Sequence, residues 1–303
     1  SRLVPSFRAA PVRVRVPATS ANLGPGFDSA GLALTLYDDV LVRVVDSGLS
    51  VDVAGEGAED VPRDRRHLVV KSLRAAFDRL GGQPRGLEVV CANRIPHARG
   101  LGSSSAAICA AVVAARALVL GGEEALDDDA ALALATELEG HPDNVAACLR
   151  GGATFAWGSP VQVLRVDPHP DLAPVVFIPA TKSSTRKVRG MLPEAVPFAD
   201  AAGNAGRAAL LPTALTTSPQ LLFAATEDRL HQQYRAPAMP RTAKLVDALR
   251  ASGVPAFVSG AGPTVLALVR AADAEAVASE VPKGWSVLSL RVEPDGAKVV
   301  PLS

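Results

Sequence analysis

The chain has 303 residues, 48% of them hydrophobic, and it carries 31 basic and 31 acidic residues, so its formal net charge is zero. This length suffices for two domains, or for one large one, with a sizeable core. The neutral balance and the lack of a basic stripe argue against a nucleic-acid partner. The longest apolar run, residues 106–120, is interrupted by Arg116 and is too short to span a bilayer, which argues against a membrane protein.

Three cysteines, Cys91, Cys109 and Cys148, are widely spaced, and each has apolar or small neighbours. Their number is odd and no Cys-x-x-Cys pair occurs, so we expect buried, reduced thiols. The sequence begins without the charged and then apolar pattern of a signal peptide. These features together predict a cytoplasmic protein.

In the first half of the chain, apolar alternation over residues 12–16 predicts a strand that Pro17 ends. A polar, glycine-rich loop follows it, over residues 18–28. The other elements expected in this half are strands at 40–45, 49–53, 87–90 and 153–157, and helices at 67–80, 108–120, 127–139 and 145–149.

Residues 158–172 are rich in Pro and Asp, so we place a domain boundary there and expect domains at 1–165 and 166–303. Strands and helices alternate without a regular βαβ pattern, which favours the α+β class. The second domain is expected to hold strands at 174–178, 265–269 and 286–292, and helices at 198–211, 219–231, 241–251 and 271–280.

A loop rich in glycine and serine, here called the Gly/Ser loop, lies between the strand at 87–90 and the helix at 108–120. The first turn of a helix has backbone N–H groups without an intrahelical partner, and the helix dipole adds partial positive charge. A phosphate cradle is therefore predicted at Pro96, His97, Ala98, Arg99, Gly100, Leu101, Gly102, Ser103, Ser104, Ser105 and Ala106.

This loop is not a Walker A motif, because no Gly-Lys-Ser/Thr follows its glycines, and its glycine spacing differs from the dinucleotide-binding fingerprint. The alternative interpretation is a structural glycine turn with a serine N-cap on a buried helix. Three consecutive serines after two glycines favour phosphate binding.

Three motifs stand in order along the chain: residues 20–28, the Gly/Ser loop, and residues 259–264. Together they resemble the GHMP small-molecule kinases. Within that superfamily, the Ser-Ala-Asn-Leu-Gly-x-Gly-Phe-Asp run at 20–28 and the His-Pro-Asp-Asn segment at 141–144 are similar to homoserine kinases. The sugar-kinase opening, Gly-Arg-x-Asn-Leu with Gly-Glu-His, is absent.

The resemblance implies two domains, one similar to the second domain of ribosomal protein S5 and one ferredoxin-like. It implies ATP-dependent phosphorylation of the L-homoserine hydroxyl to O-phospho-L-homoserine, in threonine biosynthesis, by a homodimer. Without a Walker lysine, the loop backbone, its serines and Mg²⁺ would share the phosphate charge. Ser103 and Glu137 are the predicted metal ligands, chosen over Glu139, for which a solvated carboxylate at the helix end is the alternative.

The substrate-binding residues that the resemblance implies are Asn22, Asp28, His141, Asn144, Thr185, Arg189, Arg235 and Gly262. Of these, Asn22, Asp28 and Arg189 are predicted to act in catalysis. Arg189 and Arg235 are candidates for a bidentate clamp on the substrate carboxylate, although Arg189 lies in a basic segment and could be a solvated arginine. Asn22 and Asp28 could be turn residues. Residues 259–264 are expected to support the loop structurally.

No candidate for a strong general base stands out, so we predict that positioning and charge stabilisation drive the transfer. Two other functions remain open at this point. The chain could be a GHMP kinase for a mevalonate-like or sugar substrate, or an inactive relative that binds ligand as a sensor.

Overall fold

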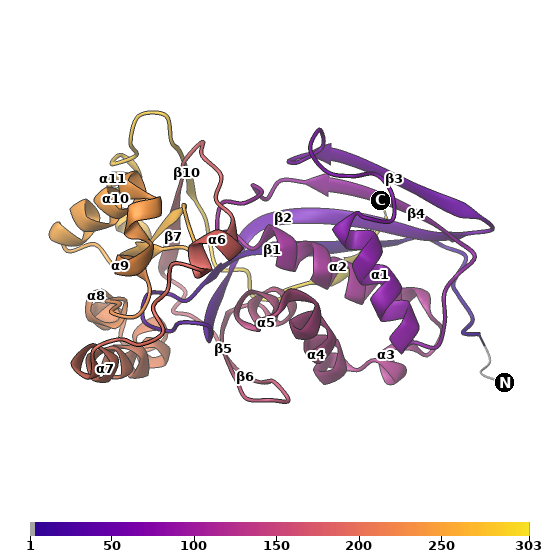
Figure 1. Ribbon diagram of the computed structural model, residues 1–303, viewed down its shortest axis with the longest axis horizontal. Coiled ribbons are helices and arrows are strands. Elements are labelled where there is room, and N and C mark those ends of the chain that lie inside the picture. Colours follow the sequence, from indigo (N-terminus) through magenta and orange to yellow (C-terminus); the bar gives the residue numbers. More distant parts are fainter. Residues whose placement is uncertain (1–3, 303) are drawn as a thin grey trace.

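The computed structural model describes residues 4–302 and contains two β-sheets, each covered by helices (Figure 1). The large sheet has the strand order β11-β1-β2-β4-β3, with β5 paired to β2 and β6 paired to β5. The smaller sheet has the order β10-β7-β9-β8. Two largely antiparallel sheets with helices packed against them confirm the α+β class.

The large sheet is antiparallel except for the parallel pair β3 and β4. Its strands are β1 (Val12–Ala21), β2 (Ala30–Val45), β3 (Gly48–Gly55), β4 (Gly86–Asn93), β5 (Ala153–Trp157), β6 (Gln162–Val166) and β11 (Lys298–Val300). The prediction that Pro17 ends β1 is wrong. The strand continues because the register shifts between Pro17 and Ala18, and such an irregularity accommodates a proline.

Helices α1, α2, α4 and α5 lie together against the large sheet, with α2 packed on β1 and β2 (Figure 1). Their bounds are α1 (Leu68–Arg79), α2 (Ser103–Leu118), α3 (Gly122–Ala125), α4 (Asp128–Glu139) and α5 (Asp143–Arg150). The side chains of Ala106, Ala110, Ala111, Ala114 and Ala115 are fully buried. Such small residues let α2 approach the sheet closely, as the alanine-rich sequence indicates.

The smaller sheet comprises β7 (Leu172–Ile178), β8 (Ala256–Val258), β9 (Val265–Arg270) and β10 (Ser286–Ser289). The helices of this half are α6 (Thr185–Arg189), α7 (Phe198–Leu215), α8 (Leu222–Ala225), α9 (Gln232–Arg235), α10 (Pro240–Ala251) and α11 (Ala274–Ala278). Helices α10 and α11 pack on this sheet, and a second apolar core forms between them and its strands.

One expectation in this half is wrong, and another differs in detail. The helix predicted at 219–231 is a 3-10 turn, Pro219–Leu221, followed by the short α8, because Thr226 returns its hydroxyl to the carbonyl of Leu222 and the chain then turns. The helix predicted at 271–280 is present but differs in detail, since it begins as a 3-10 turn, Ala271–Asp273, and α11 ends at Ala278.

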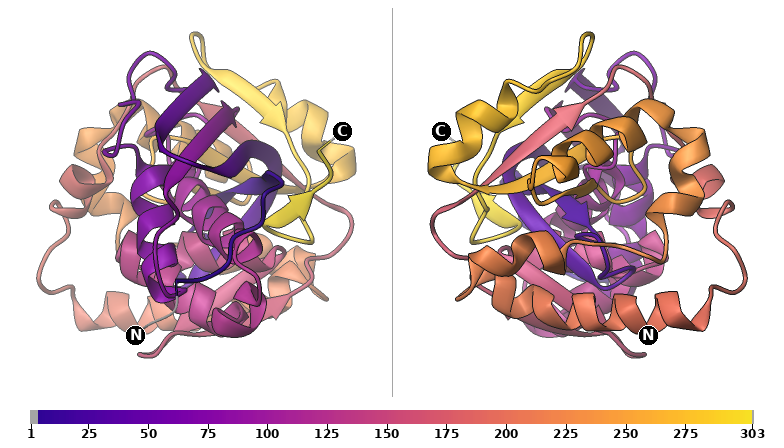
Figure 2. Two further views of the ribbon diagram at one scale, coloured as in Figure 1. Left: turned by 90° about the vertical axis from the view of Figure 1, so that its right-hand side faces the viewer. Right: turned by 90° about the vertical axis from the view of Figure 1, so that its left-hand side faces the viewer.

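The two sheets separate within the predicted boundary, since β6 belongs to the large sheet and β7 to the smaller one. The end of the chain then returns to the large sheet, where β11 pairs antiparallel with β1. Figure 2 shows this yellow segment beside the indigo start of the chain. The chain thus crosses from the large sheet to the smaller one between Val166 and Leu172, and its final strand belongs again to the large sheet.

The three cysteines are buried free thiols, as expected. Within residues 4–302, no helix combines the length and apolar character that crossing a membrane would need.

Candidate active site

The Gly/Ser loop joins the end of β4 to α2, and two of its glycines adopt left-handed backbone conformations. Gly100 has φ +83°, and a Cβ there would lie 2.3 Å from the carbonyl oxygen of Ser259. Gly102 has φ +72°, and a Cβ there would lie 2.2 Å from Oγ1 of Thr19. Both positions require glycine because of their backbone angle and because neighbouring segments approach so closely.

Helix α2 begins at this loop without a side-chain cap. Its N-cap is Gly102, and no side chain hydrogen-bonds there. The alternative of a serine N-cap is therefore wrong. Ser103 is half-buried, Ser104 is exposed, and the Ser105 hydroxyl lies in the protein interior. The first-turn N–H groups and the Ser103 hydroxyl remain available to an anion.

The second glycine turn, residues 259–264, packs directly on the Gly/Ser loop. The Ser259 hydroxyl donates to the carbonyl of Gly100 at 2.7 Å, and the Thr264 N–H donates to the carbonyl of Arg99 at 3.1 Å. These contacts confirm the expected structural support. Gly262, predicted to bind substrate, instead faces Met239, whose sulfur would lie 2.7 Å from a Cβ at this glycine.

A polar cluster lies beside the loop, around the turn between β1 and β2. The Asp28 carboxylate receives both Nη groups of Arg189, with Nη1 at 3.1 Å. The backbone N–H of Asp28 donates to Oδ1 of Asn22 at 3.0 Å. Asn22 and Asp28 adopt left-handed conformations, with φ of 75° and 58°, which Asn and Asp tolerate better than most residues. These contacts bring together Asn22, Asp28 and Arg189, the three predicted catalytic residues.

The Phe27 ring lies between the two predicted arginines of this cluster. The guanidinium carbons of Arg189 and Arg235 lie 5.4 and 5.5 Å from the ring centroid. Arg235 is buried, and its Nη1 donates to the carbonyl of Gly260 at 3.4 Å while its Nε has no hydrogen-bond partner. Burial and the charge of Arg189 lower the pKa of Arg235. A ligand carboxylate that contacts both guanidinium groups would offset the burial of the Arg235 charge and its repulsion by Arg189.

His141 lies near the Asp28–Arg189 pair, with its Nδ1 3.7 Å from Oδ1 of the buried Asp143. Asp143 raises the pKa of His141, and the charges of Arg189 and Asp28 also act on the ring. Asn144 accepts a hydrogen bond from the Thr19 hydroxyl at 2.8 Å, so it lies under Gly102 rather than in this cluster. Thr185 is exposed at the start of α6.

Two glutamates at the end of α4 have different surroundings. Glu137, the predicted metal ligand, is 65% exposed and bonds to Arg79 at 2.6 Å on the outer surface. Glu139 instead accepts a hydrogen bond from the Ser104 hydroxyl at 2.8 Å, and burial raises its pKa. The choice of Glu137 is thus corrected, because residues two apart on a helix point in different directions and only Glu139 faces the loop.

A cavity of about 280 Å³ adjoins the start of α2 and was missed by sequence reasoning. Its walls come from three separate segments, so no contiguous motif marks it. Besides His97, Ser103, Ser104 and Ala106 of the Gly/Ser loop, it is lined by Ala107, Asp38, Val40, Val61, Pro62, Arg66, His67, Leu68, Val69, Cys91 and Asn93.

Asp38 is the buried acid of this cavity. Its Oδ1 accepts hydrogen bonds from the backbone N–H groups of Arg94 at 2.7 Å and Ile95 at 2.9 Å, which fixes the entry to the Gly/Ser loop. Burial nevertheless raises the pKa of Asp38 to about 6. An apolar cavity with a few polar groups beside a phosphate cradle has the composition of a nucleoside site.

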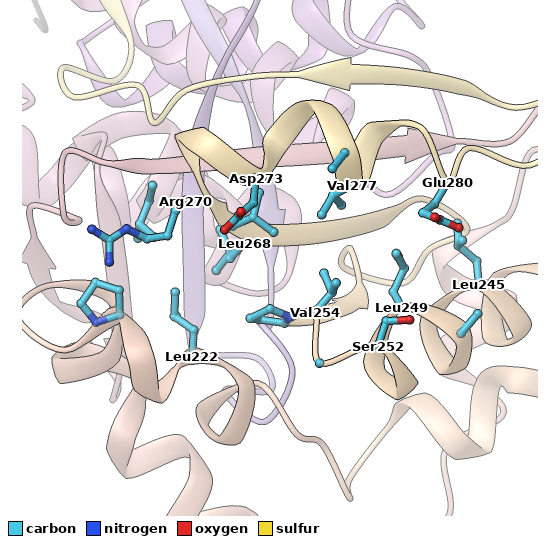
Figure 3. Close-up of a pocket in the computed structure, with 17 residues that line it drawn as sticks. Leu222, Leu245, Leu249, Ser252, Val254, Leu268, Arg270, Asp273, Val277 and Glu280 are labelled. Atoms are coloured by element: carbon cyan, nitrogen blue, oxygen red, sulfur yellow. The ribbon is translucent and has the colours of Figure 1, made fainter.

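A larger cavity, about 430 Å³, lies in the C-terminal half between α10, α11 and β9 (Figure 3). Leu222, Leu249, Leu268 and Val277 give it an apolar lining. None of its residues belongs to the three motifs or touches the polar cluster. The chemistry is therefore assigned to the smaller cavity and the cluster, despite the difference in volume.

Comparison with known proteins agrees with this geometry. Residues 67–152 match the GHMP kinases N terminal domain and residues 209–287 match GHMP kinases C terminal. The chain is similar to a homoserine kinase of Streptomyces avermitilis, with 64% identity over 301 residues and 99% of each chain covered. It is also similar to a homoserine kinase of Streptomyces coelicolor, with 63% identity and 99% and 97% covered.

Solved structures show the same likeness. The crystal structure of homoserine kinase from Cytophaga hutchinsonii superposes with a TM-score of 0.86 at 26% identity, covering 99% of this chain and 100% of that one. A mevalonate kinase from L. major shares the fold at 17% identity and a TM-score of 0.68, covering 98% of this chain and 99% of that one. Because both GHMP kinase domains match and the identity to homoserine kinases extends over the full chain, the chain belongs to the homoserine kinase family of the GHMP kinases.

Proposed function

We propose that this protein transfers the γ-phosphoryl group of ATP to the side-chain hydroxyl of L-homoserine, giving O-phospho-L-homoserine. The observation that carries the proposal is the Asp28–Arg189 ion pair beside the uncapped start of α2. The pair places one negative and one positive group next to a phosphate cradle. An amino acid substrate is a zwitterion that can satisfy both groups at once.

The charge pattern favours homoserine over the other substrates of the superfamily. Its ammonium matches the Asp28 carboxylate, and its carboxylate matches the forked donors of Arg189 and Arg235. Mevalonate carries a carboxylate but no ammonium, and a sugar carries neither. Mevalonate would draw Arg189 away from Asp28 and leave that carboxylate without a cationic partner, at a cost in free energy. A sugar has no charged group to exchange with either member of the pair.

In this proposal the base and ribose of ATP occupy the 280 Å³ cavity, and the triphosphate lies along the Gly/Ser loop. The α2 N–H groups and the Ser103 hydroxyl would donate to phosphate oxygens. The side chain of Leu101 is buried and serves as an anchor for the loop. The glycines let the phosphates approach the backbone.

The residues near Ser104 also fit a Mg²⁺ ion. No group of three or more His, Cys, Asp or Glu side chains within residues 4–302 could hold a metal by itself. Mg²⁺ suits such a sparse site, because it keeps several waters and takes substrate phosphates as ligands. Glu139 and Ser103 would hold the ion, which when bound supplies neutralisation of charge on the transferring phosphates.

Proton removal from the hydroxyl does not require a strong base in this scheme. Asp28 is engaged by Arg189, and His141 is paired with Asp143. A loose phosphoryl-transfer transition state depends mainly on alignment and on charge stabilisation. Asn22 contributes by holding the Asp28 backbone, and Arg189 by orienting the acceptor.

The test is turnover with ATP and Mg²⁺ on homoserine, mevalonate and galactose, followed by mass spectrometry of the product. We expect phosphorylation of homoserine only. Turnover of another acceptor with none of homoserine would favour a different GHMP kinase, and ATP binding without any turnover would indicate an inactive relative. The homodimer is a further prediction, checked by sedimentation.

A further inference from the structure

The Gly/Ser loop has a cationic side chain of its own, but that side chain is already used. Arg99 donates to three backbone carbonyl oxygens, those of His97 at 2.8 Å, Pro179 at 2.9 Å and Ala180 at 2.7 Å. These bonds make Arg99 a brace between the loop and the end of β7. A triphosphate on the loop must therefore find a cation elsewhere.

The brace holds one particular segment of the C-terminal half against the loop. Beyond Ala180, the backbone N–H of Ser183 donates to the carbonyl of Ala98 at 3.0 Å. Residues 180 and 183 are thus both bonded to the loop, and Lys182 lies between them.

The ammonium of Lys182 lies near His97, a residue of the nucleoside cavity, although neither Lys182 nor Asp60 itself lines that cavity. Its Nζ is 3.3 Å from Oδ2 of Asp60, and its charge contributes to lowering the pKa of His97, a residue that lines the cavity. The two side chains of the pair are 55% and 70% exposed. Exposed pairs of this kind contribute only about 0–1 kcal/mol, so this one can be exchanged for another anion.

Arg66 also lines the cavity, but it is a weaker candidate for the phosphates. Its guanidinium makes three side-chain hydrogen bonds to the Asp64 carboxylate, which raise the pKa of Arg66. Breaking a forked arginine–carboxylate pair removes several charge-assisted bonds at once. Lys182, by contrast, would lose only its single 3.3 Å contact with Asp60 on moving to a phosphate.

Building on the proposed function, we propose that Lys182 is the cation that contacts the polyphosphate of bound ATP. Its ammonium leaves Asp60 and donates to phosphate oxygens at the Gly/Ser loop. Lysine is suited to this exchange because it acts as a point charge with freely rotating donors. In the free protein, Asp60 holds the ammonium of Lys182 in the ion pair described above.

The experiment measures the dissociation constants of Mg²⁺-ATP and of adenosine by calorimetry. Lys182→Ala should raise the constant for ATP about tenfold or more, the effect of one charge-assisted hydrogen bond, and leave that for adenosine unchanged. Lys182→Arg should recover part of the loss. The matched control is Lys187→Ala, an exposed lysine of α6 without an ion pair among residues 4–302, which should bind both ligands like the wild type.

A Lys182→Ala protein with wild-type affinity for ATP would overturn the inference, and so would one that loses ATP and adenosine equally. Asp60→Asn supplies a second measurement, since it removes the competing carboxylate and should bind ATP at least as tightly as the wild type. If Asp60→Asn instead binds ATP as weakly as Lys182→Ala, then the intact ion pair, and not the lysine charge alone, is needed for ATP binding, and the inference is wrong. A wild-type protein that fails to bind ATP would overturn the proposed function itself.

Discussion

Arg189 and Asp28 lie 161 residues apart in sequence, yet the guanidinium donates to both carboxylate oxygens. This bond raises the pKa of Arg189. It joins the β1–β2 turn of the large sheet to helix α6 of the other half. Any ligand that separates the two groups must replace both partners, so the pair selects for a ligand with two opposite charges.

Arg189→Lys tests the importance of the forked geometry. The variant keeps the charge but loses the bidentate donors, so we expect the KM for homoserine to rise about 10- to 100-fold. The KM for ATP should stay unchanged in steady-state assays. Arg186→Lys, on the exposed side of the same helix, is the control and should behave like the wild type; equal effects in both variants would contradict the role of Arg189.

Asp28→Asn tests whether this carboxylate is a general base. We expect the KM for homoserine to rise and kcat to fall by less than about 100-fold, the lower end of what a general base contributes. Separate determination of kcat and KM distinguishes a role in binding homoserine from a role as a general base. Normal homoserine binding with almost complete loss of turnover would identify Asp28 as a base.

Glu139→Gln and Glu137→Gln form a matched pair on one helix end. Glu139→Gln should lower kcat and shift the Mg²⁺ concentration for half-maximal activity upward, because a neutral amide binds a hard cation more weakly than a carboxylate. Glu137→Gln loses only an exposed ion pair and should keep its activity. A Mg²⁺ titration of both variants checks this, and the opposite ranking would restore Glu137 as the ligand.

Gly100→Ala tests the close approach of the second glycine turn. A left-handed alanine costs about 1–2 kcal/mol wherever it occurs, and at Gly100 the added Cβ also overlaps the Ser259 carbonyl. Gly121 has φ +75° with open space around it, so Gly121→Ala isolates the first effect. We expect a larger loss of unfolding free energy in urea for Gly100→Ala, together with lost turnover. Equal losses would argue against the close contact.

Asp38→Asn tests the buried acid of the nucleoside cavity. The pKa of Asp38 is raised from 3.8 to about 6 in the folded protein, so its contribution to stability is present at low pH and is lost as pH rises through 6. Asparagine keeps an oxygen for the N–H groups of Arg94 and Ile95 but does not titrate. The difference in unfolding free energy between the variant and the wild type should therefore increase, in favour of the variant, by about 2 kcal/mol between about pH 4.5 and about pH 7.5.

Chemical denaturation at several pH values measures this difference. A variant whose stability relative to the wild type does not change with pH would show that Asp38 titrates normally in the folded state.

Contiguous runs of sequence were sufficient to predict much of this protein. The Gly/Ser loop at 96–107 and the turn at 20–28 could be found because each depends on local chemistry, namely free helix N–H groups and left-handed Gly, Asn and Asp residues. Most strands and helices of the large sheet were also predicted, since their apolar periodicity is strong.

Other features depended on which residues the fold brings together. The nucleoside cavity, the approach of Lys182 to the loop and the return of β11 to β1 each join segments far apart in the chain. Glu137 and Glu139 are two residues apart, and only the rotation of α4 against α2 decides which of them meets Ser104. The sequence by itself thus determined the glycine-rich turns and the family, because these depend on contiguous motifs and local backbone geometry. Tertiary packing decided which charges surround the Gly/Ser loop.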